Sequence, residues 1–432
     1  MARVVATPSP ELPAILGGRP TFPGGLPFAR PSVPDPPSVA REIERVLASG
    51  ILTDGPRVRE LERRAAEYVG VRHCIAVSSC TSGLLLLLRA ADLSGEVIVP
   101  SFTFPATVHA VMWNALRPAF ADIDPETLTL EPGSAALAVG ARTSAILATH
   151  IFGTPCDAQG LAAVARRNGL RLFFDAAHAF GSRKGEVPVG GLGDGEVFSL
   201  SPTKVLVAAE GGLIATDDDV LAERCRIGRN YGNPGDYDCR LVGLNARMSE
   251  VHAAIALASL DGLEERIAHR NALAAAYCRT LADVRGVSFP AVRQGDRSTF
   301  KDFTILVEPA AFGVDADTLA VALRAEGIET RRYYTPPVHV QRAYRSLVVT
   351  NGDLPVTEAA ASRVLTLPMW SDMTEEHLAL VGEAIVRIHR WVWDPSSRGS
   401  AEKLRRMGRV GTRKASYRSV RGERLQRRDE DA

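Results

Sequence analysis

The stretches RLFFDAAHAFGS (residues 171–182) and EVFSLSPTKVLVAAEGG (residues 196–212) decide the fold class. Each opens with a short apolar run, typical of a buried strand, and then changes to small and polar residues. Similar apolar runs alternate with helical patterns between residues 74 and 218. Continuous apolar strands separated by helices predict an α/β fold with a mostly parallel sheet covered on both faces. Ligands of such sheets bind at the carboxyl ends of the strands.

The chain has 432 residues, of which 46% are hydrophobic, and it carries 51 basic and 50 acidic side chains. Because single cores stop growing at about 250–300 residues, we expect two domains. The C-terminal segment 396–432 holds 12 basic and five acidic side chains, so the rest of the chain is mildly acidic. This distribution argues against nucleic acid as the main partner.

Composition and pattern divide the chain into four parts. Residues 1–37 are rich in proline and glycine and predict an extended arm. The alternating strands fall in a large domain, expected over residues 38–275, and a smaller C-terminal α/β domain is expected over residues 276–395. The basic tail, residues 396–432, is predicted to be disordered.

The six cysteines are scattered and form no CxxC motif, so they indicate neither a zinc site nor a disulfide framework. The N-terminus lacks the apolar core of a signal peptide, and no run of about 18 apolar residues appears. We therefore expect a soluble, cytoplasmic protein without a bound metal ion and without a membrane partner.

Asp175 and Lys204, which are 29 residues apart, follow two of the apolar runs and are expected at the same edge of the sheet. Taken singly, such an aspartate is usually a turn or cap residue, and such a lysine is usually a surface charge. Together they fit a pyridoxal phosphate site equally well. There the aspartate keeps the ring nitrogen protonated, and the lysine forms the imine and later acts as a base.

The segment SSCTSGLLLLL (residues 78–88) changes from the end of an apolar strand directly into a helix. Backbone N–H groups and the hydroxyls of Thr81 and Ser82 at this helix N-terminus form a candidate phosphate site. Ser199, at the end of another strand, is a further candidate. The alternative is an ordinary serine or threonine cap of a buried helix.

Eight ordered motifs resemble the DegT/DnrJ/EryC1/StrS family of pyridoxal-phosphate-dependent sugar aminotransferases, and the resemblance covers roughly residues 28–393. The motifs are GILTDGPRVRELE, SSCTSGL, VIVPSFTFPAT, FADIDPETL, FFDAAHAFGS, FSLSPTKVL with EGGLIATDD, GLNARMSEVHAA and GIETRRYYTPPVH. The resemblance implies a transferase of fold type I, with a large cofactor-binding domain and a smaller C-terminal domain. It also implies a homodimer with shared active sites.

The resemblance assigns roles to single residues. Lys204 in SPTK would form the imine with the cofactor, and Asp175 in DAAH would pair with the ring nitrogen. His178 would lie against the ring, and Phe104 in SFTF would stack on the opposite ring face, although both are also compatible with a core position. The phosphate would be bound by Thr81, Ser82, Ser199 and Asn245, the last from the second subunit unless it is only a turn residue.

The implied reaction moves an amino group from L-glutamate to a nucleotide-linked keto sugar, with ping-pong kinetics, in deoxyaminosugar or antibiotic biosynthesis. The lysine and aspartate motifs are more similar to members that aminate C4 of a dTDP-4-keto-6-deoxyhexose than to those that act at C3. Candidate substrate-binding residues are Tyr231, Arg331 and Tyr333. A C3 keto sugar or an inosose is an alternative acceptor. A non-catalytic regulatory protein of the same fold is an alternative of another class.

Overall fold

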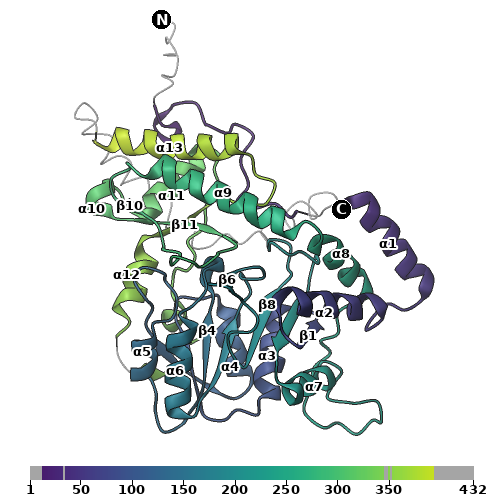
Figure 1. Cartoon of the computed structure of the whole chain (residues 1–432). Helices are drawn as coiled ribbons and strands as arrows, with labels where there is room; N and C mark the ends of the chain where they lie inside the picture. Colours follow the sequence, from purple (N-terminus) through teal and green to yellow (C-terminus); the bar gives the residue numbers. More distant parts are fainter. Residues whose placement is uncertain (1–11, 33–34, 345–348, 351–352, 394–432) are drawn as a thin grey trace, which may run out of the picture.

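The computed structural model describes residues 12–32, 35–344, 349–350 and 353–393. The basic tail and the first 11 residues of the expected arm lie outside the described residues. Figure 1 shows a lower body around a large sheet and an upper body formed by the later part of the chain. The helix α1 (Pro36–Ser49) projects at one side of the lower body (Figure 1).

The lower body contains the mostly parallel sheet that the apolar runs predict. Among the described residues it has eight strands in the order β1-β9-β8-β5-β4-β2-β3-β12. Only β9 runs against its neighbours within this part of the chain. The strands are β1 (His73–Val77), β2 (Glu96–Pro100), β3 (Arg117–Ala121), β4 (Thr143–Thr149), β5 (Arg171–Asp175), β8 (Gly195–Ser199), β9 (Gly212–Thr216) and β12 (Val349–Thr350).

Helices cover both faces of the sheet because consecutive strand residues point to opposite sides. Phe173 of β5 packs among residues of α3 and α4, whereas Phe174 packs among residues of α5 and α6. The first face is covered by α3 (Cys80–Ala90), α4 (Pro105–Trp113) and α7 (Asp219–Gly228). The second face is covered by α2 (Pro56–Val69), α5 (Pro132–Leu137), α6 (Ala158–Asn168) and α8 (Glu250–Leu260).

The N-terminus of α2 is capped by a distant carboxylate. Glu250, at the start of α8, is buried and accepts hydrogen bonds from the backbone amides of Gly55, Arg57 and Val58 at 2.8–2.9 Å. These amides are among the donors that a helix leaves without an intrahelical partner. Glu250 therefore fastens α2 to α8.

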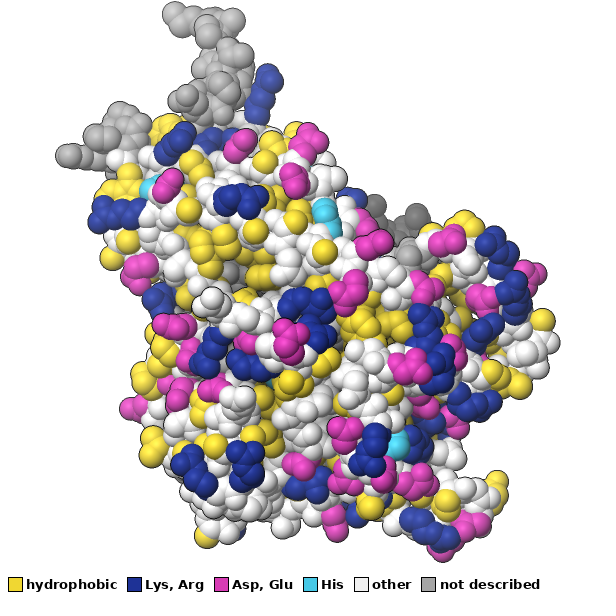
Figure 2. Space-filling view, viewed as in Figure 1, with side chains coloured by type: hydrophobic (Ala, Val, Ile, Leu, Met, Phe, Trp, Pro, Cys, Tyr) yellow, Lys and Arg dark blue, Asp and Glu magenta, His cyan; other side chains and the backbone are white. Residues whose placement is uncertain are grey.

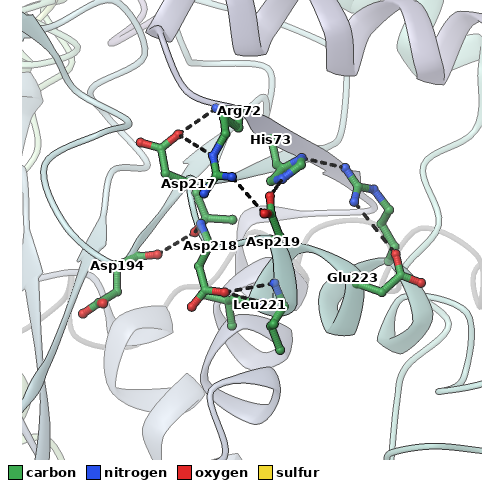
Figure 3. Close-up of polar contacts among 11 residues, drawn as sticks. Arg72, His73, Asp194, Asp217, Asp218, Asp219, Leu221 and Glu223 are labelled. Atoms are coloured by element: carbon green, nitrogen blue, oxygen red, sulfur yellow. Dashed lines mark hydrogen bonds and ion pairs between the residues drawn. The ribbon is translucent and has the colours of Figure 1, made fainter.

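A polar network ties the strands together at the edge opposite their carboxyl ends (Figure 3). Asp217 accepts from the amide of Arg72 at 2.8 Å, and Asp219 binds the side chains of Arg72 and His73 at 2.8 and 2.7 Å. Asp218 caps α7 by accepting from two backbone amides, each at 3.0 Å. These contacts join the beginning of β1 to the end of β9 and leave the carboxyl edge to other residues.

The upper body is built on a three-stranded antiparallel sheet. Its core includes Tyr277, Phe303 and Ile385. The strands are β10 (Val287–Ser288), β11 (Phe303–Val307) and β13 (Val364–Leu367), and the helices are α9 (Leu263–Leu281), α10 (Pro309–Phe312), α11 (Ala316–Ala325), α12 (Pro355–Arg363) and α13 (Glu375–Trp393). The shorter elements of the chain are η1 (Ala14–Leu16), η2 (Ile151–Gly153), η3 (Val338–Val340), β6 (Arg183–Lys184) and β7 (Val187–Pro188).

The described part of the arm lies along the upper body. Leu26 forms a bridge with Ile328, and Glu326 accepts from the amides of Ala14 and Thr21 at 2.8 and 3.0 Å. Acidic and basic side chains are interspersed over the face shown in Figure 2, in agreement with the balanced composition. Within the described residues, the helices are all too short or too polar to cross a membrane.

Candidate active site

Asp175 ends β5 at the carboxyl edge of the large sheet, and its side chain is only 3% exposed. Its Oδ2 accepts a hydrogen bond from Thr107 Oγ1 at 2.6 Å, and its Oδ1 accepts from the amide of Ala177 at 3.1 Å. Burial raises the pKa of Asp175, and these two hydrogen bonds and the charge of Lys204 oppose the rise.

Lys204 lies in the loop after β8, where its amide donates to the carbonyl of Ser201 at 3.0 Å. Burial and the positive charge of Lys301 lower the pKa of the Lys204 amine to about 8, against smaller opposing effects of Asp302, Cys80 and Asp175. The charges of Lys204 and Asp175 thus act on each other. The structure brings these two predicted residues together at one edge of the sheet.

His178 follows β5 by three residues and is half-buried. Its Nδ1 accepts a hydrogen bond from the amide of Phe152 at 3.1 Å. Burial, followed by the charges of Lys204 and Lys301, lowers the pKa of His178 well below its ordinary value. The ring is therefore neutral near pH 7, and because Nδ1 accepts, Nε2 carries the proton.

The three hydroxyl residues proposed for phosphate binding occupy the ends of β8 and the first turn of α3. The N-cap of α3 is Ser79, whose Oγ accepts from the amide of Ser82 at 3.1 Å, and Ser82 Oγ accepts from the amide of Ser79 at 3.0 Å. The hydroxyl of Ser82 thus belongs to a capping box, the ordinary cap that the sequence left open. Thr81 lies in the same turn, and Ser199 is the last residue of β8.

Close backbone packing sets the position of this turn. A side chain at Gly212 of β9 would place its Cβ 2.7 Å from the amide nitrogen of Cys80, and one at Gly83 would meet Val197 at the same distance. The glycine in β9 and the glycine in α3 therefore let the helix N-terminus approach the strands directly. The first turn of α3 is held beside the ends of β8 and β9 as a result.

Aromatic side chains gather near the start of α4. Phe104, the N-cap residue of α4, is 56% exposed, and its ring lies 6.3 Å from that of Tyr334. Tyr334 is buried and stacks on Tyr333 at 5.1 Å. Burial raises the pKa values of both tyrosines, and the negative charge of Asp302 adds to this. Phe104 is thus a surface-accessible ring and not a core residue.

Two further predicted residues, Asn245 and Tyr231, lie in an exposed loop. Asn245 forms an isolated bridge with Asn230, and Tyr231 donates its amide to the carbonyl of Leu244 at 2.9 Å. The guanidinium of Arg247 lies 5.3 Å from the centre of the Tyr231 ring. Exposure of this loop leaves Asn245 and Tyr231 available to another molecule.

Arg331 and Tyr333 come from the upper body. Arg331 forms a bridge with Thr366, and its guanidinium lies 5.1 Å from the Phe28 ring. Lys301 Nζ lies 5.9 Å from the centre of the Tyr333 ring. Tyr333 therefore lies beside Lys301, whose charge acts on the amine of Lys204.

Three further residues of this region, Thr107, Lys301 and Asp302, belong to none of the predicted site positions. Thr107 sits inside α4 and gave no motif of its own. Lys301 and Asp302, however, stand side by side immediately before the apolar strand β11 and are 5% and 3% exposed. Two adjacent charges that open a buried strand were a visible signal, since buried charges are usually paired or functional.

The site fits pyridoxal phosphate. A buried carboxylate and a half-buried amine of lowered pKa lie at one sheet edge, as a ring-nitrogen partner and an imine-forming lysine require. The first turn of α3 offers amides and hydroxyls to a phosphate. Residues 37–386 match the DegT/DnrJ/EryC1/StrS aminotransferase family. The chain belongs to this family.

Two relatives match the chain over most of its length. The aminotransferase is 34% identical over 359 residues to a pleiotropic regulatory protein of Geobacillus stearothermophilus. The matched region covers 82% of the aminotransferase and 95% of the relative. It is 31% identical over 361 residues to the spore coat polysaccharide biosynthesis protein SpsC of Bacillus subtilis, with 80% and 92% covered.

Among solved structures, the aminotransferase resembles DesI in the presence of its TDP-sugar product, with 39% identity and a TM-score of 0.85. This match covers 92% of the aminotransferase and all of the DesI chain. These similarities show a sugar aminotransferase of fold type I that depends on pyridoxal phosphate.

Proposed function

We propose that the aminotransferase moves the amino group of L-glutamate to C4 of a dTDP-4-keto-6-deoxyhexose. The observation that carries this proposal is the placement of Lys204 and Asp175 at one sheet edge, where the charge of each acts on the other and the Lys204 pKa is about 8. The similarity to DesI, solved with a TDP-sugar product, supports the choice of acceptor. When bound, pyridoxal phosphate supplies an electron sink for the carbon that loses a proton.

Asp175 would keep the ring nitrogen of the cofactor protonated. Its carboxylate is dry and fixed, because Thr107 and the amide of Ala177 each hold one oxygen. A buried anion without a cation is costly, so Asp175 favours a protonated partner strongly. This preference supports a direct pairing between the carboxylate and a ring N–H.

Lys204 would hold the cofactor and then, as a free amine, carry a proton between donor carbon and cofactor. An amine with a pKa of about 8 is partly neutral near pH 7–8, so it can both accept and return a proton. The neutral ring of His178 would lie against the cofactor, with Nε2–H free to donate to an oxygen. Phe104 would cover the opposite face.

Thr81, Ser82 and Ser199 would bind the phosphate, together with the amides of the first turn of α3. Asn245 would join them from a second copy of the chain, which requires a homodimer. Apolar side chains exposed on α1 and in the segment after it support such an interface, because a lone chain would leave them in water. They include Leu47, Ile51 and Leu52.

We place the sugar substrate at the junction of the two bodies, with Tyr333 from the upper body and Arg331 at its margin, and with Tyr231 contributed by the second copy from the same loop as Asn245. This placement would suit a role in deoxyaminosugar or antibiotic biosynthesis. All six cysteines are free thiols, which suits work in the reducing cytoplasm.

A regulatory role without catalysis is the second candidate, since one relative is named a pleiotropic regulatory protein. The two proposals differ in a simple observation. An enzyme loaded with pyridoxal phosphate changes its visible absorbance on addition of L-glutamate, and a regulator does not.

The acceptor is tested with the enzyme in its aminated form. After treatment with L-glutamate and removal of excess donor, the protein is mixed with dTDP-4-keto-6-deoxyglucose, the corresponding 3-keto sugar, the UDP-linked analogues or an inosose. We expect rapid recovery of the original spectrum with dTDP-4-keto-6-deoxyglucose and an amine at C4 in the NMR spectrum of the product. Recovery only with a 3-keto sugar or an inosose would overturn the assigned position.

A further inference from the structure

A buried ion pair adjoins the site and has no role in the reaction described above. Lys301 Nζ donates to Asp302 Oδ1 at 2.7 Å, and both side chains are nearly inaccessible to water. Both residues directly precede β11 in the upper body. Their charges act on Lys204: the charge of Lys301 lowers the pKa of the Lys204 amine, and the charge of Asp302 raises it.

The identity of the cation is unusual for this chain. Its 51 basic residues comprise 46 arginines and only five lysines, at positions 184, 204, 301, 403 and 414. Two of the three lysines before the basic tail, Lys204 and Lys301, therefore lie close enough for the charge of one to act on the other. A chain that uses arginine almost everywhere else has a lysine where a compact, mobile ammonium group is needed.

The backbone around the pair is held firmly. The guanidinium of Arg270, which is 2% exposed, donates to the carbonyls of Phe300 and Lys301 at 2.7 and 2.6 Å. The amide of Lys301 donates to the carbonyl of Phe152, whose own amide donates to His178. The pair is thus fixed to the same strand-end region that carries His178.

The pair still has unused hydrogen-bonding capacity. Asp302 Oδ2 is buried and has no hydrogen-bond partner among the residues that the structure describes. The ammonium of Lys301 has three protons, one of which goes to Asp302. A buried acceptor without a donor costs about 1–3 kcal/mol, so such a group is expected to have a partner in the working state.

The unused acceptor of Asp302 and the unused donors of Lys301 together fit a hydroxyl group as their ligand. Together the two side chains are electrically neutral, so they offer no net attraction to a carboxylate or phosphate. A hydroxyl both donates and accepts, and it satisfies Asp302 Oδ2 and the Lys301 ammonium at once. The Tyr333 ring next to Lys301 adds an apolar face of the kind that packs on the C–H groups of a sugar ring.

We propose that Lys301 and Asp302 together bind the sugar hydroxyl on the carbon next to the one that is aminated. In the dTDP-4-keto-6-deoxyhexose of the proposed function, on which this inference rests, that group is the C3 hydroxyl. Asp302 Oδ2 accepts a hydrogen bond from the hydroxyl, and the Lys301 ammonium donates one to the hydroxyl oxygen. The pair positions the acceptor sugar and takes no part in the half-reaction with the amino donor.

The test uses the double variant Lys301→Gln/Asp302→Asn, which replaces the ion pair by two amides of similar size. Because one positive and one negative charge are removed together, their opposing effects on the pKa of Lys204 partly offset each other. The control is Lys184→Gln/Asp296→Asn, which neutralises a second lysine–aspartate pair of the same 2.7 Å length beside the β6–β7 hairpin.

Each half-reaction is measured separately by rapid mixing of the pyridoxal-phosphate-loaded protein. The probes are L-glutamate for the first half-reaction and dTDP-4-keto-6-deoxyglucose or its 3-deoxy analogue for the second. For the double variant we expect kcat/KM of the second half-reaction to fall about 10- to 100-fold, as loss of a hydrogen bond to a charged group predicts. The first half-reaction should stay within about threefold of the wild-type rate, which also shows that the variant is folded.

The analogue isolates the contact. Wild-type protein should lose about the same factor on the 3-deoxy sugar, whereas the double variant should treat the two sugars alike. The control variant should behave as the wild type does. Equal discrimination by wild-type and double-variant protein, or an equal fall in both half-reactions, would overturn the role of the pair. Failure of the wild-type protein with every keto sugar would instead overturn the proposed function, and this inference with it.

Discussion

Thr107 Oγ1 donates a hydrogen bond to Asp175 Oδ2 at 2.6 Å, both groups being buried. Because the only hydroxyl proton of Thr107 is used in this contact, Thr103 must donate to Thr107 over their 2.8 Å separation. Thr149, 3.1 Å from Thr103, continues the same chain. Asp175 is therefore held at the end of a line of three threonine hydroxyls that connects α4 to β4.

Substitution of this threonine should slow the chemistry without removing any group that touches substrate. In Thr107→Val the shape of the side chain is kept, but Asp175 loses one of its two hydrogen bonds, so the pKa of Asp175 rises further. The carboxylate then competes more strongly for the proton that should stay on the ring nitrogen. We expect the half-reaction with L-glutamate to slow about 10-fold, as a loss of about 1.5 kcal/mol implies. Thr107→Ser restores the hydroxyl and should recover most of the rate. Equal rates for the Val and Ser variants would show that the hydrogen bond is unimportant.

The amine of Lys204 should react as a group with a pKa of about 8. Protein freed of cofactor is mixed with pyridoxal phosphate over a range of pH values, and imine formation is followed by visible absorbance. Because only the neutral amine attacks, the rate should rise with pH and level off above about pH 8. An ordinary lysine, with a pKa of about 10.4, would give a rate that still rises at pH 10. Such a profile would contradict the burial argument.

Glu250 should contribute to stability through the N-terminus of α2. Glu250→Gln keeps the size of the side chain but turns an NH2 group toward one of the backbone amides that Glu250 accepts from. We expect the free energy of unfolding to fall by about 1.5–3 kcal/mol in urea titrations. The matched control is Glu44→Gln on the exposed side of α1, which should change it by less than about 0.5 kcal/mol. Similar values for the two variants would remove Glu250 from this role.

Much of the fold could be predicted because its strands are short, continuous apolar runs that alternate with helical patterns. The runs that contain Phe173 and Val197 are buried in the mostly parallel sheet that their pattern indicates. The positions of Asp175 and Lys204 follow from the same pattern, since each comes after the end of a strand. The fold class and the family are confirmed.

The supporting residues could not be predicted in the same way. Thr107 lies inside α4 and meets Asp175 only because the packing of α4 on the sheet brings them together. The role of Ser82 in the cap of α3 depends on which serine ends the strand, a choice that Ser78, Ser79 and Ser82 leave open in the sequence. The approach of Lys301 to the site depends on how the upper body rests on the lower one. Such contacts arise from tertiary packing, and no local pattern encodes them.

The central claim is that Lys204 carries the cofactor, and the small number of lysines makes the measurement decisive. Protein loaded with pyridoxal phosphate is reduced with borohydride, digested and mapped by mass spectrometry. We predict a pyridoxyl group on the peptide that contains Lys204 and on no other lysine peptide. A label on Lys301 or Lys184, or the absence of any label, would contradict the account.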